Sequence, residues 1–281
     1  MKIAISVEST NDLTKELLEK NDISVIAYEI TLGDKNFYDG EFGVLEMFEY
    51  VDKYNTLPKT TAINEYRYTE YFEELKKKYD AVVHICLSSG ITSSCNNAFM
   101  AAKNVENVYV VDSKSLSTGI GLLALYGREL AESGVEASEI AKTLQTRAEK
   151  LQVSFVVERL DYLHKGGRCT SLQLLGSNLL KIRPRIVLKD GKMCSDGKYR
   201  GEMARVVGKY CNETIEEFNN PDLSRVFITY TTATPEMLAN AREALQNRGF
   251  KEILETNAGG TIASHCGANT LGILYFNDGN K

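Results

Sequence analysis

The chain has 281 residues, of which 43% are hydrophobic and 25% are charged, and its formal net charge is −5 at pH 7. These proportions are typical of a soluble globular protein with one large domain or two ordinary ones. The negative charge argues against a general nucleic-acid surface, which needs clustered positive charge. No apolar run reaches the roughly 18 residues of a membrane span. No secretory signal is visible either, so we expect a cytoplasmic protein.

The first half of the chain alternates between strand-like and helix-like hydrophobic patterns. Predicted strands cover residues 2–7, 23–32, 81–87 and 108–113. Predicted helices cover residues 44–54, 65–79, 95–103, 119–132 and 137–151, and a shorter amphipathic segment ends at Glu19. Strands that alternate with helices in this way predict a mainly parallel sheet with helices on both faces.

Hydroxyl and acidic residues follow the ends of several of these strands, namely Ser9–Thr10, Thr92–Ser94 and Asp112–Ser113. Because ligands of parallel α/β sheets bind beyond the carboxyl ends of the strands, we expect these residues to converge on one crevice. The helix after the second group presents free backbone N–H groups, which suit an anionic ligand. The simpler alternatives are that Thr92 or Ser93 only caps that helix and that the third group is structural.

The second half of the chain has a different order of elements. It opens with a predicted strand at residues 154–162, a basic glycine turn at 163–168 and an apolar stretch at 171–180, suited to a helix or an intersubunit surface. A hairpin about residues 190–192, helices at 203–218 and 235–249, and strands at 225–231, 253–254 and 271–276 follow. We therefore expect two domains, residues 1–152 with the parallel sheet and residues 153–281 with a mixed α/β fold.

Familiar catalytic patterns are absent from the sequence. It has no G-x-S-x-G nucleophile elbow, no phosphate loop and no G-x-G-x-x-G after a predicted strand. The six cysteines are scattered, without a C-x-x-C pair or a histidine at ligand spacing. We therefore expect reduced thiols, and neither a zinc site nor a disulfide framework.

Short motifs along almost the whole chain resemble those of the DegV family of bacterial lipid-binding proteins. Ser9–Leu13 resembles the family's D-S-T-x-D-L, with Glu8 in place of the first acid. Further motifs follow in the family's order, namely Lys59–Ala62, Ser88–Ser94, Val111–Ser113, Leu160–Arg168, Asn178–Pro184, Asp190–Gly191 and Ser264–Gly267. No single motif is decisive, but the ordered set is specific. The chain is thus identified as a member of this family, as one unit over residues 2–280.

The resemblance implies a two-domain α/β protein that binds one long-chain fatty acid, such as palmitate, in a buried tunnel between the domains. A separate fatty acid kinase subunit would then form an acyl phosphate on the presented carboxylate. The chain itself would be a lipid-binding protein rather than an enzyme, with a fatty acid as ligand and no cofactor. A transient contact with a membrane surface is compatible with this role. The acyl chain length, the kinase partner and the oligomeric state stay open.

The resemblance also assigns carboxylate-binding residues. The hydroxyls of Thr60 and Thr92 match the family's carboxylate-binding groups. Thr61 and the backbone around Ser93 would lie close by, and His265 matches the family's histidine near the carboxylate. Alternatively, Thr60 is only a loop hydroxyl, Thr92 only caps a helix, and His265 is a structural histidine.

Two arginines are candidates for docking the kinase partner. Arg200 matches a family arginine associated with this contact, and Arg168 belongs to the glycine–arginine turn near the same face. Surface salt bridges are the alternative for both residues. Ser93 replaces a family glycine and Cys266 replaces a threonine, and these departures affect the head-group geometry more than the fold.

Two other functions remain as alternatives. A small-molecule phosphotransferase or hydrolase would use His265 near the Thr92 turn, and it would turn over without a partner in a polar, open pocket. A binding protein for another amphipathic anion, such as an isoprenoid acid, would instead keep a tunnel. The mass of the extracted ligand distinguishes that case from a fatty acid.

Overall fold

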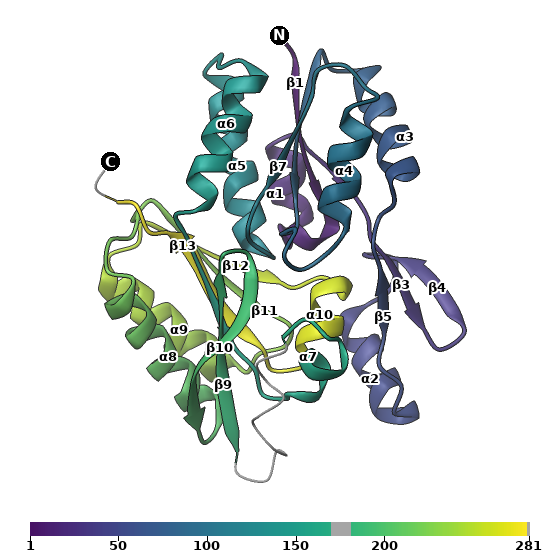
Figure 1. The fold of residues 1–281 in the computed structure, drawn as a ribbon. Coiled ribbons are helices and arrows are strands. Elements are labelled where there is room, and N and C mark those ends of the chain that lie inside the picture. The colour runs from purple at the N-terminus through teal and green to yellow at the C-terminus, as the bar shows by residue number, and fades with distance from the viewer. Residues whose placement is uncertain (170–180, 280–281) are drawn as a thin grey trace.

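The structure is a computed structural model that describes residues 1–169 and 181–279. In Figure 1 the first half of the chain forms the upper part, the second half forms the lower left, and a small sheet with one helix lies at the lower right. The predicted apolar stretch at 171–180 and the first three residues of the Asn178–Pro184 motif lie outside the described residues.

A parallel four-stranded sheet forms the centre of the first half, as the alternation of elements predicts. Its strands lie in the order β2 (Ile23–Ile26), β1 (Ile3–Glu8), β6 (Ala81–Cys86) and β7 (Val108–Asp112). Every residue of β1 and β6 is buried, as expected for central strands covered on both faces. The strand order reverses between β1 and β6, so the carboxyl ends of these strands form the topological switch point.

Helices cover both faces of this sheet (Figure 1). On one face α3 (Glu65–Lys76) and α4 (Ser94–Ala102) pack together over β6, and on the other α5 (Thr118–Glu132) packs beside α6 (Ala137–Ala148). The short helix α1 (Lys15–Lys20) contacts β2. Because α4 begins directly after the turn that contains Thr92, its packing determines where that turn lies.

The predicted strand at 23–32 is wrong in one respect, because the structure divides it between two sheets. β2 ends at Ile26, and β3 (Glu29–Leu32) belongs to an antiparallel sheet of order β4-β3-β5. The other members of this unit are β4 (Lys35–Tyr38), helix α2 (Val44–Tyr54), predicted with these bounds, and β5 (Lys59–Thr61). A continuous apolar run does not reveal where a chain changes sheets. The division affects the position of Thr60, because Thr60 lies on β5, which pairs with β3 in the separate sheet. The segment of β5 was predicted as irregular.

The second half is built on a six-stranded mixed sheet. Its order is β10 (Lys192–Arg200), β9 (Ile182–Lys189), β8 (Leu151–Val156), β13 (Leu271–Phe276), β11 (Arg225–Tyr230) and β12 (Glu252–Asn257). Only β11 and β12 pair in parallel within this described sheet. The hairpin predicted about Asp190–Gly191 is confirmed, and both turn residues have positive φ, as a two-residue hairpin loop requires.

Helices α8 (Met203–Glu217) and α9 (Pro235–Arg248) pack against each other beside this sheet. Several elements differ from the prediction, among them the strand predicted at 154–162, which ends at Val156. β8 begins at Leu151 rather than 154, so the proposed domain boundary at 152/153 falls inside a strand, and it stays a proposal. Helix α7 (Asp161–Lys165) occupies part of the predicted turn, and helix α10 (Gly260–Cys266) was not predicted. Both helices are too short to produce a clear hydrophobic period.

The two halves share an apolar core rather than being joined only by a linker. One buried cluster contains Ile5 and Leu116 from the first half together with Phe155 and Leu274 from the second. A cavity bounded by both halves is therefore surrounded by packed side chains. Within residues 1–169 and 181–279, no helix is long and apolar enough to cross a membrane.

Candidate functional site

Most of the residues that the sequence singled out surround one cavity between the two halves. Its empty volume, which includes space open to solvent, is about 510 Å³. Polar lining comes from Tyr28, Thr60, Thr92, Arg168, Thr261 and His265. Apolar lining includes Leu87, Ile91, Leu116, Leu163, Met193 and Ile262. A mainly apolar cavity with a few polar groups is typical of a site for a small amphipathic molecule.

Thr60 and His265 lie next to each other, although they are far apart in sequence. Thr60 sits opposite Ile30 in the small sheet, and helix α10 carries His265. The Thr60 Oγ1 and His265 Nε2 atoms are 2.8 Å apart, which is a hydrogen-bonding distance. Burial and, to a smaller extent, the charge of Arg168 lower the pKa of His265 to about 4. The imidazole is therefore neutral at pH 7, and its Nε2 can donate or accept one hydrogen bond according to tautomer.

Helix α10 is held in place by two aspartates from the first half. Asp39 accepts hydrogen bonds from the backbone N–H groups of Gly260 (2.7 Å) and Thr261 (3.2 Å). Asp12 accepts one from the N–H of Gly259 (2.8 Å). Carboxylates at this position satisfy N–H groups that have no partner inside the helix. Neither role is visible in the sequence, because the pattern around Asp39 indicates only a turn.

The turn after β6 is tied to the segment that follows Thr60. The Thr92 Oγ1 atom lies 3.1 Å from Ser94 Oγ and accepts a hydrogen bond from the Ser94 N–H (3.2 Å). Ser94 Oγ accepts a further hydrogen bond from the N–H of Ile63 (3.0 Å). Thr92 therefore supports the turn before α4 and also lines the cavity. Ser93 is the N-cap residue of α4, but its side chain makes no capping hydrogen bond.

Thr61 and Ser93 lie at the margin of this arrangement. Both side chains are exposed, and neither lines the cavity. Ser93 has a φ of −77°, which is an ordinary right-handed value, so its replacement of a family glycine causes no backbone strain. A direct role of Thr61 or Ser93 in ligand binding stays a prediction.

The hairpin of the second half closes against the turn of the first half. Ser88 Oγ donates a hydrogen bond to the Gly191 carbonyl oxygen (2.7 Å). A Cβ atom on Gly90 would lie 2.6 Å from that same oxygen, so only glycine permits this approach. Met193, two residues along β10, reaches the cavity lining. The two glycine-containing turns thus bring both halves together at the cavity.

Asp112 has a structural role at the end of β7. Its carboxylate accepts hydrogen bonds from the N–H and hydroxyl of Ser89 (3.2 and 2.5 Å), and it forms an ion pair with Lys114 (2.9 Å). Burial raises the pKa of Asp112, but hydrogen bonds from Ser89 and Lys114 outweigh burial, so the net pKa is lowered. The ionised Asp112 therefore anchors the start of the Thr92 turn outside the cavity lining.

The two arginines proposed for partner docking lie in different places. Arg168 is exposed and also lines the cavity, with its Nη1 donating to the Gly166 carbonyl oxygen (2.6 Å). Arg200 is exposed at the end of β10 and is not part of the lining. The structure therefore places Arg168 at the site, whereas a contact of either arginine with a partner stays a prediction.

A second cavity adjoins the first one. Its empty volume is about 340 Å³, and its lining includes Phe155 and Leu274 from the mixed sheet. Leu116, Ile262 and Cys266 line both cavities. An extended apolar molecule that enters at Thr60 could therefore continue past these three residues, although a continuous tunnel stays a prediction.

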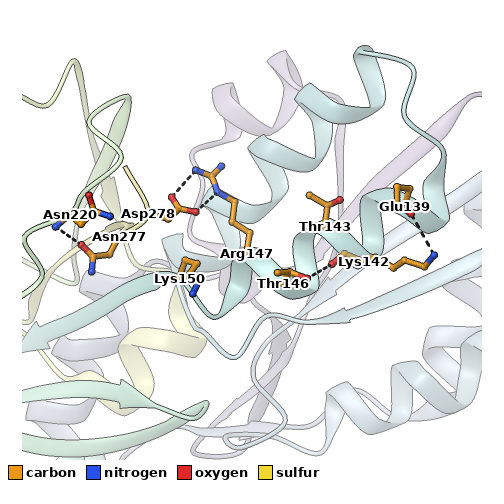
Figure 2. A pocket seen from close by; sticks show the side chains of 9 residues that line it. All are labelled: Glu139, Lys142, Thr143, Thr146, Arg147, Lys150, Asn220, Asn277 and Asp278. Atoms are coloured by element: carbon orange, nitrogen blue, oxygen red, sulfur yellow. Dashed lines mark hydrogen bonds and ion pairs between the residues drawn. The ribbon is translucent and has the colours of Figure 1, made fainter. Parts of the chain in front are cut away.

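A wider and more polar groove lies away from this site (Figure 2). Its cationic residues include Lys142, which pairs with Glu139 (3.5 Å), and Arg147, which pairs with Asp278 (3.2 Å). Because these charges are already compensated, we assign the groove no ligand.

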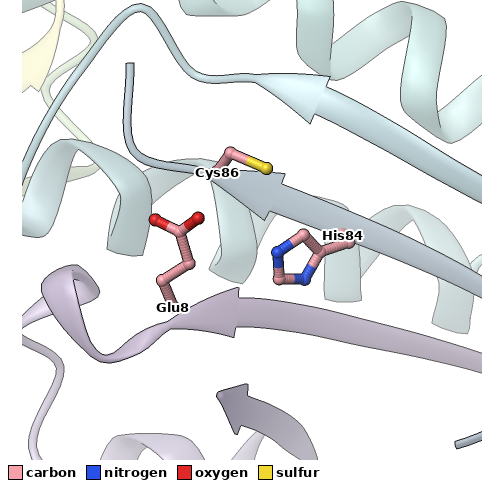
Figure 3. A group of neighbouring side chains, drawn as sticks. All are labelled: Glu8, His84 and Cys86. Atoms are coloured by element: carbon pink, nitrogen blue, oxygen red, sulfur yellow. The ribbon is translucent and has the colours of Figure 1, made fainter. Parts of the chain in front are cut away.

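Glu8, His84 and Cys86 belong to residue types that can ligate metals, and their candidate atoms lie within 4.8 Å of one another (Figure 3). The Glu8 oxygens, however, already accept hydrogen bonds from three hydroxyl groups and one backbone N–H. This arrangement is that of a hydrogen-bonded buried acid, and we do not assign it to a metal. In the sequence, Glu8 stands out only as a departure from the family motif.

Solved structures of similar fold come from several bacteria. A DegV family protein from Thermus thermophilus, described by its fatty acid binding, superposes with a TM-score of 0.87 at 25% identity, over 98% of this chain and 99% of that one. DegV of Bacillus subtilis, described as a fatty acid binding protein, superposes with a TM-score of 0.86 at 27% identity over the same shares. The mixed α/β fold is therefore that of these proteins over essentially the whole chain.

Sequence comparisons agree with the fold. A DegV domain-containing protein of Clostridium perfringens is 29% identical over 279 residues, which is 98% of each chain. Another from Staphylococcus aureus is 34% identical over 220 residues, which is 77% of each chain. The family model described as "Uncharacterised protein, DegV family" matches residues 2–278. The chain therefore belongs to the DegV family.

Proposed function

We propose that this protein binds one long-chain fatty acid, with the carboxylate at Thr60, Thr92 and His265. The observation that carries the proposal is that Thr60, Thr92 and His265 line one mainly apolar cavity, in which Thr60 Oγ1 and His265 Nε2 lie 2.8 Å apart. The Thermus and Bacillus relatives, which are described as fatty acid binding proteins, support it.

The chemistry of the polar groups suits a carboxylate. A carboxylate that leaves water needs hydrogen-bond donors in compensation, and charge-assisted hydrogen bonds are stronger than neutral ones. Thr92 can supply such a donor, and so can Thr60 when the neutral His265 donates its Nε2 hydrogen to the Thr60 oxygen. Arg168 adds a positive charge at the lining. The Thr261 hydroxyl lines the same cavity and is buried without a hydrogen-bond partner among the described residues, so it is available to a ligand.

The apolar lining suits the acyl chain. Each buried methylene group contributes about 0.8 kcal/mol, so the roughly 14 methylene groups of palmitate supply about 11 kcal/mol. Association costs of about 4–15 kcal/mol oppose this gain. A long chain is therefore needed for tight binding, and the mainly apolar lining of the adjoining second cavity suits contact with its distal part.

We further propose that the bound carboxylate is presented to a separate kinase subunit, which would form the acyl phosphate. The DegV motifs support this role, and Arg168 connects the cavity lining with the protein surface. Arg168 and Arg200 are the proposed docking residues. Under this proposal the chain alone forms no acyl phosphate from ATP and a fatty acid.

Native mass spectrometry of the protein purified from bacterial cells tests fatty-acid binding. We expect one fatty acid per chain, which denaturation releases for identification. Protein that is empty and cannot be loaded with any acid from myristic to stearic acid would contradict the proposal. A stoichiometric ligand of isoprenoid mass would instead favour a different amphipathic anion.

An enzymatic function remains the second candidate, because one observation favours it. The Thr60 hydroxyl and His265 imidazole, 2.8 Å apart, resemble a nucleophile and its general base. The His265 Nδ1 atom, however, is buried with no hydrogen-bond partner among the described residues, whereas such a base is usually oriented by a third group. Turnover of a phosphoryl or acyl ester by the chain alone, lost on substitution of His265, would favour this candidate.

Replacement of Gly166 by alanine is expected to displace His265. A Cβ atom at Gly166 would lie 2.5 Å from His265 Nδ1 and 2.9 Å from the Tyr162 carbonyl oxygen. Because the backbone oxygen cannot easily give way, the imidazole must move, and its contact with Thr60 is lost. We expect Gly166→Ala to weaken palmitate binding about tenfold, the effect of one hydrogen bond to a charged group.

Isothermal titration calorimetry with palmitate measures this effect, and Gly167→Asn is the matched control. Gly167 has a φ of +69° and no atom within 4 Å of its would-be Cβ, and asparagine tolerates this conformation. Equal affinity of the Gly166→Ala and Gly167→Asn variants would show that the position of His265 is unimportant for binding.

A further inference from the structure

A buried carboxylic acid lies at the end of β1, beside the cavity but outside its lining. The Glu8 side chain is fully buried. Its hydrogen-bond donors are the hydroxyls of Tyr68, Tyr28 (3.2 Å) and Thr10 (3.5 Å) and the backbone N–H of Leu87 (2.8 Å). None of these donors carries a positive charge. Ionised Glu8 is therefore hydrogen-bonded but not neutralised by its donors.

The titratable groups that face Glu8 from neighbouring elements are uncharged as well. His84 and Cys86 of β6 lie beside Glu8 (Figure 3), and Tyr68 donates a hydrogen bond to it from α3. Burial lowers the pKa of His84 to about 3 and raises the pKa values of Cys86 and Tyr68 well above their usual range. Cys95 of α4 contacts Cys86. Burial also raises the pKa of Glu8 to about 7, although its hydrogen bonds oppose this effect.

Tyr28 connects this acid with the proposed carboxylate site. Its side chain is 2% exposed, lines the cavity, and donates its hydroxyl hydrogen to Glu8 Oε2 at 3.2 Å. Burial and the charge of Glu8 raise the pKa of Tyr28, and the neighbouring hydroxyls of Ser94 and Thr92 partly oppose this rise. The Tyr28 oxygen therefore lies between the buried acid and the Thr92 side of the cavity, but its single hydrogen can serve only one acceptor at a time.

On the premise of fatty-acid binding, we propose that Tyr28 is a further head-group residue and that the carboxylate binds together with one proton taken up by Glu8. When Glu8 is ionised, it holds the Tyr28 hydrogen and places a second negative charge near the ligand. When a proton from solvent neutralises Glu8, the Tyr28 hydrogen turns to the ligand carboxylate beside Thr92. Protonation also removes a repulsion that is strong in a poorly solvated site.

The coupling has a definite sign. Since the ligand favours protonated Glu8, affinity is constant below the pKa of Glu8 in the free protein, which is about 7. Above that pH, affinity falls by up to about tenfold per pH unit, because binding must take up a proton. The pKa of His265 is about 4, so His265 does not titrate in this range. Asp12, whose pKa burial also raises, is the other buried acid near the cavity.

Calorimetric titration of the full chain with myristic acid tests the coupling. Titrations in phosphate and in Tris, whose ionisation enthalpies differ, count the protons taken up on binding. We expect almost no uptake near pH 6 and approximately one proton per ligand at about pH 8.5. Glu8→Gln is expected to abolish both the uptake and the pH dependence of affinity.

Two tyrosine variants distinguish a direct contact of Tyr28 with the ligand carboxylate from a hydrogen bond that only stabilises Glu8. Tyr28→Phe is expected to weaken binding about 10- to 100-fold near pH 6, where its hydrogen would otherwise reach the ligand. Tyr68→Phe removes a hydrogen bond that stabilises ionised Glu8. It is therefore expected to move the midpoint of the pH profile upward without loss of affinity near pH 6.

The outcomes distinguish this inference from the proposed function. If wild-type protein binds no fatty acid, the function proposed above fails. If it binds without proton uptake, or if the pH dependence persists in Glu8→Gln, the coupling is wrong and Asp12 becomes the group to examine. If Glu8→Gln does not fold, the comparison of Tyr28→Phe with Tyr68→Phe still tests the inference. Equal losses of affinity in these two variants near pH 6 would overturn the head-group role of Tyr28.

Discussion

Replacement of both Thr60 and Thr92 by valine is expected to reduce palmitate affinity by at least about 100-fold, the largest loss that we predict for any hydroxyl substitution. Valine keeps the shape of threonine and removes only the hydroxyl group. A hydrogen bond to a charged group contributes about 1.5–3 kcal/mol, so each variant alone should lose about tenfold or more. Thr60→Val also leaves His265 Nε2 without its hydroxyl partner at 2.8 Å.

Thr61→Val is the matched control for this prediction. Thr61 is the next residue on β5, but its side chain is exposed and does not line the cavity. Calorimetry with palmitate should therefore give nearly the wild-type affinity for Thr61→Val. A similar loss in the Thr60 and Thr61 variants would indicate a general weakening of β5, and the assignment of Thr60 to the carboxylate would be wrong.

Much of the first half could be predicted from local sequence. Helix α2 has the predicted bounds, Val44–Tyr54, and the strands β6 and β7 lie within the predicted ranges. These elements follow from apolar periodicity and from turn residues at their ends, which are local properties. The hydroxyl-rich turn at Thr92 could also be predicted, because it directly follows a buried strand.

The meeting of Thr60 with His265 could not be predicted from any local pattern. It requires β5 to pair with β3 in a sheet whose strand was expected to continue from β2. It also requires Asp39 to hold the first turn of α10. The resemblance to the DegV family named Thr60 and His265 together, but the contacts that bring them together are long-range and involve polar residues without a sequence signature.

Buried polar groups set the remaining limit on prediction. The position of Glu8 at a strand end is visible in the sequence, but its raised pKa depends on complete burial and on the absence of a cation among its four donors. Tyr28 lies where the chain passes from one sheet to another, so no periodic pattern marks it. Residues of this kind can be recognised only once the surroundings of each polar atom are known.

Replacement of Cys266 by phenylalanine is expected to shorten the acyl chain that the protein can bind. Cys266 is one of three residues that line both cavities. Burial raises the pKa of its thiol to about 12, so the substitution removes no charge at pH 7. In the wild type, each added methylene group should tighten binding about fourfold, from its contribution of about 0.8 kcal/mol. In Cys266→Phe the gain should stop at the chain length that fills the first cavity.

Affinities for saturated acids from octanoic to palmitic acid measure this limit, and Cys266→Ala is the control. Alanine leaves the junction between the cavities open, so its dependence on chain length should follow that of the wild type. Overpacking by phenylalanine costs about 1–3 kcal/mol of folding stability, which thermal unfolding can verify separately from binding. An unchanged gain per methylene group in folded Cys266→Phe would mean that the chain leaves the carboxylate site by another route. In that case the second cavity would have no part in ligand binding.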